Sequence, residues 1–143
     1  MRTLILSLVI STMFLAPSAI ADEKPDLKGF CPVAFIEMGE AMEGDPDLSS
    51  TYKGNEYYFA SEGAKELFDK NPAKYVQHIA YDGWCATAMA MSIKKQPDPT
   101  LYTIKDGNVY LFSSKEAKAQ FDKMPSKTIK KADAHWQVLS TTN

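Results

Sequence analysis

Two segments of the chain alternate hydrophobic and polar residues directly after a glycine-containing turn. In the first, Tyr57 and Phe59 alternate with more polar neighbours behind a Lys-Gly-Asn turn at residues 53–55. In the second, the same alternation follows an Asp-Gly-Asn turn at residues 106–108. A period of two residues beside a glycine turn is typical of a β-hairpin. The pattern therefore predicts two hairpins.

Helical spacing follows each hairpin. Ser61 and Ser114 stand where an N-cap is favoured, at the start of each helical pattern. In the first pattern Ala64, Leu67 and Phe68 lie at i, i+3 and i+4, which places them on one helix face. A proline ends each pattern. The sequence therefore predicts one amphipathic helix behind each hairpin.

Two further stretches have helical spacing. Residues 84–93 are rich in alanine and methionine, and residues 126–139 repeat apolar side chains at helical intervals. Hairpins and helices that follow one another in this order predict a fold of the α+β class.

The chain also repeats itself at an offset of 53 residues. The motif G-N-x-Y-x-F-x-S at residues 54–61 returns at 107–114. The motif A-K-x-x-F-D-K-x-P-x-K at residues 64–74 returns at 117–127. No gap is needed within these segments, so each hairpin and its helix form one copy of a duplicated unit.

Each copy begins at a cysteine. The motif C-x-x-A that starts at Cys31 returns at Cys85, with the offset longer by one residue. A unit of about 50 residues buries too little surface to be comfortably stable alone. We therefore expect two repeats, about 31–84 and 85–136, that share one core and pack around a pseudo-twofold axis.

Residues 1–21 have the pattern of a secretory signal peptide. Arg2 precedes an apolar run at residues 4–15, and an A-I-A cleavage site stands at residues 19–21. The run is shorter than the roughly 18 residues that a membrane-spanning helix needs, and no later segment approaches that length. We expect residues 22–143 to form a single soluble domain in the periplasm or outside the cell.

Composition narrows the function classes. The chain has 143 residues, 45% of them hydrophobic, and a net charge of −2. Loss of the leader removes Arg2, the only arginine, and makes the chain more acidic. Nucleic-acid binding is not expected, because base-edge and phosphate recognition favour arginine and basic clusters. No paired nucleophile and base, phosphate loop or haem-attachment motif is found, so we expect no enzymatic activity.

Cys31 and Cys85 leave two chemistries open. If a pseudo-twofold axis relates the repeats, equivalent residues near the axis lie close to each other. In an oxidising compartment the two thiols would pair as a disulfide. That bond would close a loop of 54 residues and stabilise the fold by about 4 kcal/mol. Reduced, the same pair would hold a soft monovalent ion such as Cu(I) or Ag(I).

Two further residues are candidate ligands for such an ion. Met89 follows Cys85 at i+4, on the same face of the predicted helix, and offers a thioether sulfur. His78 precedes Cys85 by seven residues and offers an imidazole nitrogen. We expect a histidine ligand to make the affinity fall as the pH drops through about 6.5.

The segment Y-Y-F-A-S-E-G-A-K-E-L-F at residues 57–68, followed by N-P-A-K-Y at residues 71–75, resembles the YHS domain. The resemblance covers about 45 residues, from Cys31 to Tyr75, and the whole mature chain is similar to exported YHS-containing proteins of bacteria. It implies a treble-clef-like module and metal handling, and it implies no catalysis. The positions of the family's usual cysteines are occupied here by alanine at 34, 60 and 64.

The first hypothesis from the sequence is an exported, non-enzymatic YHS protein that binds copper or a similar soft metal ion. Its ligands would be Cys31 and Cys85, with Met89 or His78 as a third.

The second hypothesis is a non-enzymatic binding or accessory module without a metal. A disulfide between Cys31 and Cys85 would stabilise it, and an exposed surface around Tyr75, Tyr81 and Trp84 would contact a protein partner or a small ligand.

Overall fold

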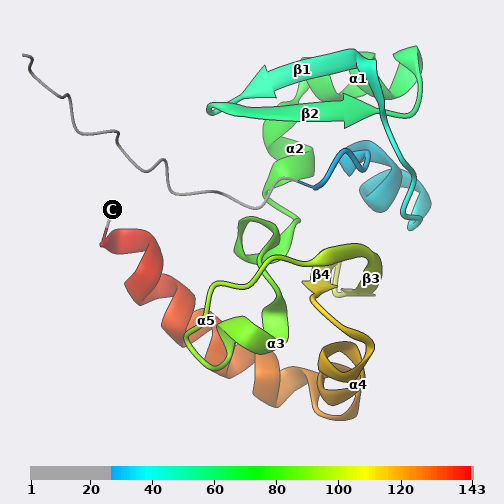
Figure 1. Cartoon of the computed structure of the whole chain (residues 1–143). Coiled ribbons are helices and arrows are strands. Elements are labelled where there is room, and N and C mark those ends of the chain that lie inside the picture. The colour runs from blue at the N-terminus through cyan, green and yellow to red at the C-terminus, as the bar shows by residue number, and fades with distance from the viewer. Residues whose placement is uncertain (1–26, 143) are drawn as a thin grey trace, which may run out of the picture.

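The computed structural model describes residues 27–142 (Figure 1), so the predicted signal peptide at residues 1–21 lies outside the described residues. The α+β class is confirmed, because two antiparallel hairpins are each followed by helices. The elements in chain order are η1 (Ala34–Met38), β1 (Asp45–Tyr52), β2 (Asn55–Phe59), α1 (Glu62–Lys70), α2 (Pro72–Val76), η2 (Ala80–Gly83), α3 (Ala86–Met89), β3 (Asp98–Lys105), β4 (Asn108–Phe112), α4 (Lys115–Lys123) and α5 (Pro125–Thr141).

The two predicted hairpins have the same local geometry. β1 and β2 are joined by Lys53 and Gly54, with φ angles of 51° and 80°. β3 and β4 are joined by Asp106 and Gly107, with φ angles of 52° and 78°. Positive φ at both central residues is the type I′ turn that matches the twist of a two-stranded ribbon. The offset of 53 residues therefore relates two turns of the same backbone conformation.

The helix starts are also confirmed. The cap serines, Ser61 and Ser114, accept the N–H groups of Ala64 and Ala117 at 3.2 and 3.1 Å. These bonds satisfy amide groups that a helix leaves without an internal partner. The proline that ends each pattern begins the next helix, α2 or α5, because its missing N–H is tolerated in the first turn.

Each repeat has its own aromatic centre. The ring of Phe68 in α1 lies 5.1 Å from that of Tyr57 and 4.9 Å from that of Phe59. The ring of Phe121 in α4 lies 5.0 Å from each of the two aromatic rings of β4. These contacts pack the helix of each repeat on its own hairpin.

β4 is buried on both faces and joins the repeats. Its residues Tyr110 and Phe112 belong to the hydrophobic cluster of the second repeat. Its residues Val109 and Leu111 are 0% exposed and belong to the cluster of the first repeat. The amide of Val109 also donates to the carbonyl of His78 at 2.8 Å. β4 therefore packs against both clusters at once.

The contacts between the repeats are not reciprocal. Phe35 in η1 packs edge-on against Tyr102 in β3, with ring centroids 5.2 Å apart, and the hydroxyl of Tyr102 donates to the carbonyl of Gly39 at 2.9 Å. A twofold axis would also bring their equivalents, Met89 and Ser49, into contact with each other. Met89 instead belongs to the cluster of the second repeat, where α3 packs against α5. The expected pseudo-twofold packing is not confirmed.

The two later helices differ in length from their predictions. The helix predicted at residues 84–93 is confined to Ala86–Met89, because Ser92 takes a φ of 61° and turns the chain away. The helix predicted at residues 126–139 is confirmed as α5, which starts one residue earlier and ends two later. Within residues 27–142 no helix is long and apolar enough to cross a membrane.

Candidate binding site between the two repeats

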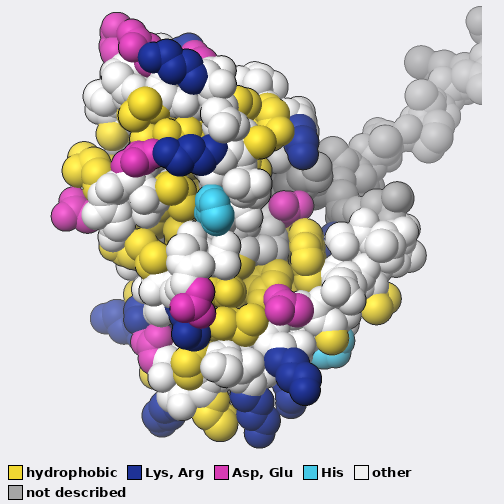
Figure 2. All heavy atoms as spheres, turned by 180° about the vertical axis from the view of Figure 1, so that it is seen from behind, with side chains coloured by type: hydrophobic (Ala, Val, Ile, Leu, Met, Phe, Trp, Pro, Cys, Tyr) yellow, Lys and Arg dark blue, Asp and Glu magenta, His cyan; other side chains and the backbone are white. Residues whose placement is uncertain are grey.

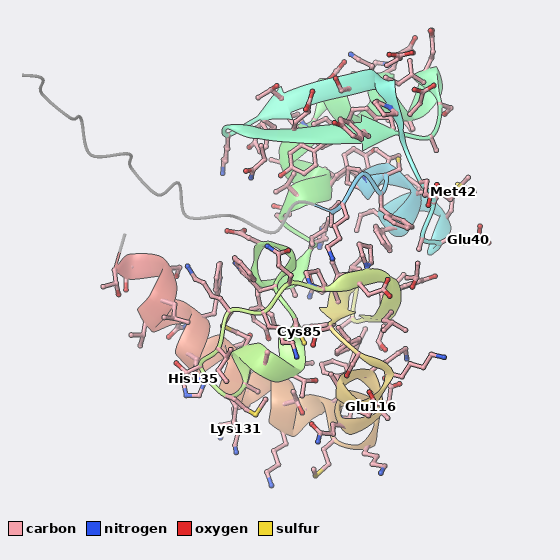
Figure 3. The ribbon with its side chains drawn as sticks, in the orientation of Figure 1. Glu40, Met42, Cys85, Glu116, Lys131 and His135 are labelled. Carbon is pink, nitrogen blue, oxygen red and sulfur yellow. The ribbon has the colours of Figure 1, made fainter. Side chains whose placement is uncertain are left out.

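The cysteines lie in different parts of the protein. Both are free and 0% exposed, Cys31 in the cluster of the first repeat and Cys85 in that of the second. The amide of Cys31 donates to the carbonyl of Met42 at 2.8 Å. Figure 3 shows Met42 beside η1 and Cys85 beside α3, well apart. The arrangement supports neither the disulfide nor a metal site that needs both sulfur atoms to meet.

The other predicted ligands are also divided between two places. Met89 is 0% exposed and is the last residue of α3, whose N-cap is Cys85, and its amide donates to the carbonyl of Cys85 at 2.9 Å. The Oγ of Ser113 donates to the Sγ of Cys85 at 3.4 Å. His78 lies elsewhere, with its Nδ1 3.3 Å from the Oδ1 of Asn108. Among the residues that the structure describes, no three His, Cys, Asp or Glu side chains are grouped to hold a metal.

The expected contact surface around three aromatic residues is wrong. Tyr75, Tyr81 and Trp84 are 1%, 6% and 7% exposed. Tyr75 packs against Phe68 in the first cluster, whereas the other two belong to the second. Their rings are structural and offer little surface to a partner.

The structure reveals a second repeated feature, a strained turn ahead of each cysteine. Residues 28 and 29 have φ angles of 47° and 82°, and residues 82 and 83 have φ angles of 51° and 88°. In each turn the preceding carbonyl accepts an N–H, at 2.8 Å for Leu27 and 3.0 Å for Tyr81. Left-handed backbone at a non-glycine residue is costly and is kept where the surroundings fix it. The turns make Leu27 and Tyr81 equivalent positions, at the same offset as the cysteines. Each structural repeat therefore begins at this turn, at residue 27 or 81, rather than at its cysteine.

Tyr81 fills its position in the second repeat. Its ring lies 6.1 Å from the ring of Tyr110 and 6.2 Å from that of Trp136. Its hydroxyl donates to the Oδ1 of Asp133 in α5 at 2.9 Å. Burial, and then the bond to Asp133, raise the pKa of Tyr81 far above its ordinary value, so the phenol stays neutral.

A cavity occupies the corresponding place in the first repeat. Its volume is about 150 Å³, and its wall is formed by Leu27, Lys53, Asn55, Tyr57, Val76, Ile79 and Asp82. A shallower groove of about 290 Å³ shares four of these residues and continues to Tyr81 and Trp136. On the face seen in Figure 2, hydrophobic side chains gather between the upper and lower parts of the protein, with acidic side chains beside them.

The cavity wall combines apolar side chains with a rim of exposed polar ones, Lys53 and Asp82. Leu27, Val76 and Ile79 supply the apolar side chains. The amide of Asn55 lies 3.5 Å from the hydroxyl of Tyr57, a long hydrogen bond. Asp82 is exposed, and its carboxylate makes no hydrogen bond or ion pair with residues 27–142.

Electrostatics at the rim favour a neutral Tyr57. Burial raises the pKa of the Tyr57 hydroxyl, the hydrogen bond from Asn55 lowers it, and the charge of Asp82 raises it again. Tyr57 therefore keeps its proton and is a neutral phenol in the cavity wall. A slot of this kind, apolar with few polar groups, is suited to binding a small molecule or a single side chain.

Comparison with known families finds a match within the first repeat. Residues 43–79 match the sequence pattern of the YHS domain. These residues form a YHS domain. The YHS domain contains the first hairpin, α1 and α2, and it ends at Ile79, which forms an isolated bridge with Val109 of β4. Elements of the same kind recur from Asp98 onward, beyond the matched segment.

One curated relative shares a short segment with the chain. Mouse adenylate kinase 9 is 43% identical over 51 residues, which are 36% of this chain. The aligned segment spans only 3% of the kinase's length, so the similarity covers a small part of that protein. No solved structure matches the chain significantly.

Sequence reasoning missed the cavity residues. Asn55 and Lys53 were assigned only to a turn, and Leu27 and Asp82 to no element. The signal was present in the repeat itself, because the offset that aligns the cysteines also aligns Leu27 with Tyr81. An aliphatic residue in one copy and a larger aromatic residue at the equivalent position of the other indicate a space that one copy leaves open.

Proposed function

We propose that the protein is an exported, non-enzymatic binding module whose YHS domain holds a small ligand in the cavity between the repeats. The observation that supports this best is the 150 Å³ space beside Leu27, where the other repeat is filled by its own side chain. Apolar side chains, together with a phenol, an amide, a carboxylate and the ammonium group of Lys53, provide both contact area and orientation. Export rests on the leader pattern of residues 1–21.

The test is a titration of ¹⁵N-labelled residues 22–143 with a set of small polar and apolar compounds. A ligand of this site shifts the amide signals of cavity residues such as Ile79 and Asp82. Val76→Phe narrows both cavity and groove and is expected to weaken binding at least tenfold. Its matched control, Ile129→Phe, changes the equivalent position of the second repeat and should leave binding unchanged. Ligands that bind Val76→Phe as tightly as the parent would refute the site.

Soft-metal binding is the second candidate function. It is supported by Cys85 at the N-cap and Met89 at the end of α3, two sulfur-containing side chains of the kind that soft metals prefer, both buried in one cluster. Competition for Cu(I) against a coloured chelator, on reduced protein, tests it. Cys85→Ser and Met89→Leu should each weaken binding, whereas Cys31→Ser is the matched control from the other repeat. Equal Cu(I) affinity in all three variants would eliminate this candidate.

A further inference from the structure

The second repeat shows which shape fits the cavity of the first. Most residues of the cavity wall have an equivalent in the second repeat, and several of these equivalents belong to or pack against the cluster that contains Tyr81. The pairs, first repeat then second, are Asn55 and Asn108, Tyr57 and Tyr110, Val76 and Ile129, Ile79 and Ala132, and Leu27 and Tyr81. The space left beside Leu27 is therefore the counterpart of the space that a phenol ring fills beside Tyr110.

The size of the cavity agrees with this comparison. Tyr81 stands against the ring of Tyr110 with a tilt of 55° between the ring planes. Leu27 is shorter and lacks a ring, and about 150 Å³ remains open next to Tyr57. A volume of roughly 150 Å³ is large enough for a benzene ring. The ring of Tyr57 supplies the aromatic wall against which such a ring packs.

The polar rim selects a hydrogen-bond donor. In the second repeat the hydroxyl of Tyr81 donates to Asp133, whose equivalent in the first repeat is Ala80. The carboxylate near the cavity is instead Asp82, which lines both the cavity and the groove. Because the Asp82 carboxylate makes no hydrogen bond or ion pair with the described side chains, it is available to accept from a ligand. Lys53 lines the same cavity, with its Nζ 5.4 Å from the centre of the Tyr52 ring.

We infer that the cavity binds an aromatic ring that carries a hydroxyl group, a phenol, with Tyr57 as the ring wall and Asp82 as the hydrogen-bond acceptor. This rests on the proposed function and names its ligand class. Such a ring reaches the site either as a free phenol or as a tyrosine side chain of a polypeptide. The groove toward Trp136 offers room for a polypeptide backbone beside the ring.

The experiment compares three probes of similar size on residues 22–143. They are p-cresol, toluene, which lacks the hydroxyl group, and 4-methylcyclohexanol, which lacks the planar ring. We expect p-cresol to bind about fivefold more tightly than 4-methylcyclohexanol, the size of an aromatic pair contact. Asp82→Asn should reduce the preference for p-cresol over toluene.

Two reciprocal variants test the comparison between the repeats. Leu27→Tyr gives the first repeat the residue of the second and should abolish p-cresol binding. Tyr81→Leu should open a second site, so that two p-cresol molecules bind per chain and raise its melting temperature. Binding of p-cresol that is unchanged in Leu27→Tyr overturns the inference, whether or not Tyr81→Leu folds well enough to be measured.

The outcomes separate this inference from the proposed function. If 4-methylcyclohexanol binds as tightly as p-cresol and Leu27→Tyr blocks both, the preference for an aromatic ring is refuted while the cavity remains a binding site. If no compound shifts the cavity amides, both fail. N-acetyltyrosinamide tests the source: tighter binding than p-cresol supports a tyrosine side chain, and weaker binding supports a free phenol.

Discussion

Replacing Val109 by alanine is expected to destabilise the whole chain by about 2–3 kcal/mol. The side chain is 0% exposed and packs into the cluster of the first repeat from a strand of the second. Loss of the buried methyl groups costs about 1.6 kcal/mol, at roughly 0.8 kcal/mol each. The remaining cavity adds to this cost. The hydrogen bond from the Val109 amide to the carbonyl of His78 is retained by alanine.

Urea unfolding of residues 22–143 measures the change. Far-UV circular dichroism follows both repeats, whereas tryptophan fluorescence reports on the second hydrophobic cluster, which contains Trp84 and against which Trp136 packs. Because β4 packs against both clusters, the two signals should shift together and stay coincident. The melting temperature should fall by about 10 °C, given roughly 4 °C per kcal/mol for a domain of this size.

Glu56→Ala is the matched control, since Glu56 occupies the equivalent position in β2 and is exposed. It should change the free energy of unfolding by less than about 0.5 kcal/mol. A loss in Val109→Ala no larger than that of the control would refute the reasoning. Separate transitions in the two signals of the parent protein would show that β4 does not couple the repeats.

Three further predictions use the same unfolding assay or a simple titration. Alanine at either cap serine should cost about 1 kcal/mol, with threonine as the milder control, and the double variant should be additive because the caps are in separate repeats. Hydrogen bonds from Lys74 and then Tyr75 lower the pKa of Glu37. On acidification this carboxyl is therefore protonated at a higher pH in the unfolded state than in the folded state. Stability should therefore fall between about pH 5 and 3, and less steeply in Glu37→Gln. Both cysteines should resist a thiol reagent in the native protein and react only after unfolding, without reductant, because they are free and 0% exposed; a disulfide would give no reaction.

Local structure was readable from the sequence because it depends on local chemistry. The glycine turns, the cap serines and the buried positions of Phe68 and Phe121 follow from neighbouring residues and are found as predicted. The short α3 was not foreseen, because alanine and methionine favour a helix whereas the left-handed Ser92 ends it. Tertiary contacts decide such boundaries.

The relation between the repeats could not be read from their similarity. A duplicated sequence is compatible with a twofold pair or with a succession of units, and the contacts decide between them. The deciding residues are those that differ between copies, such as Val109, whose equivalent in the first repeat is Glu56. The hypothesis of two meeting cysteines depended on the twofold axis, and it loses its support for the same reason.

Because both faces of β4 are buried, each half of the chain depends on the other for its folded structure. A fragment that ended before Cys85 would leave Phe35 without the ring of Tyr102, and a fragment that began there would open Leu111 to water. Destabilising mutations in either half are therefore expected to affect the whole chain. After duplication, such mutual dependence turns two interchangeable units into obligate partners, and selection then acts on them as one inherited piece.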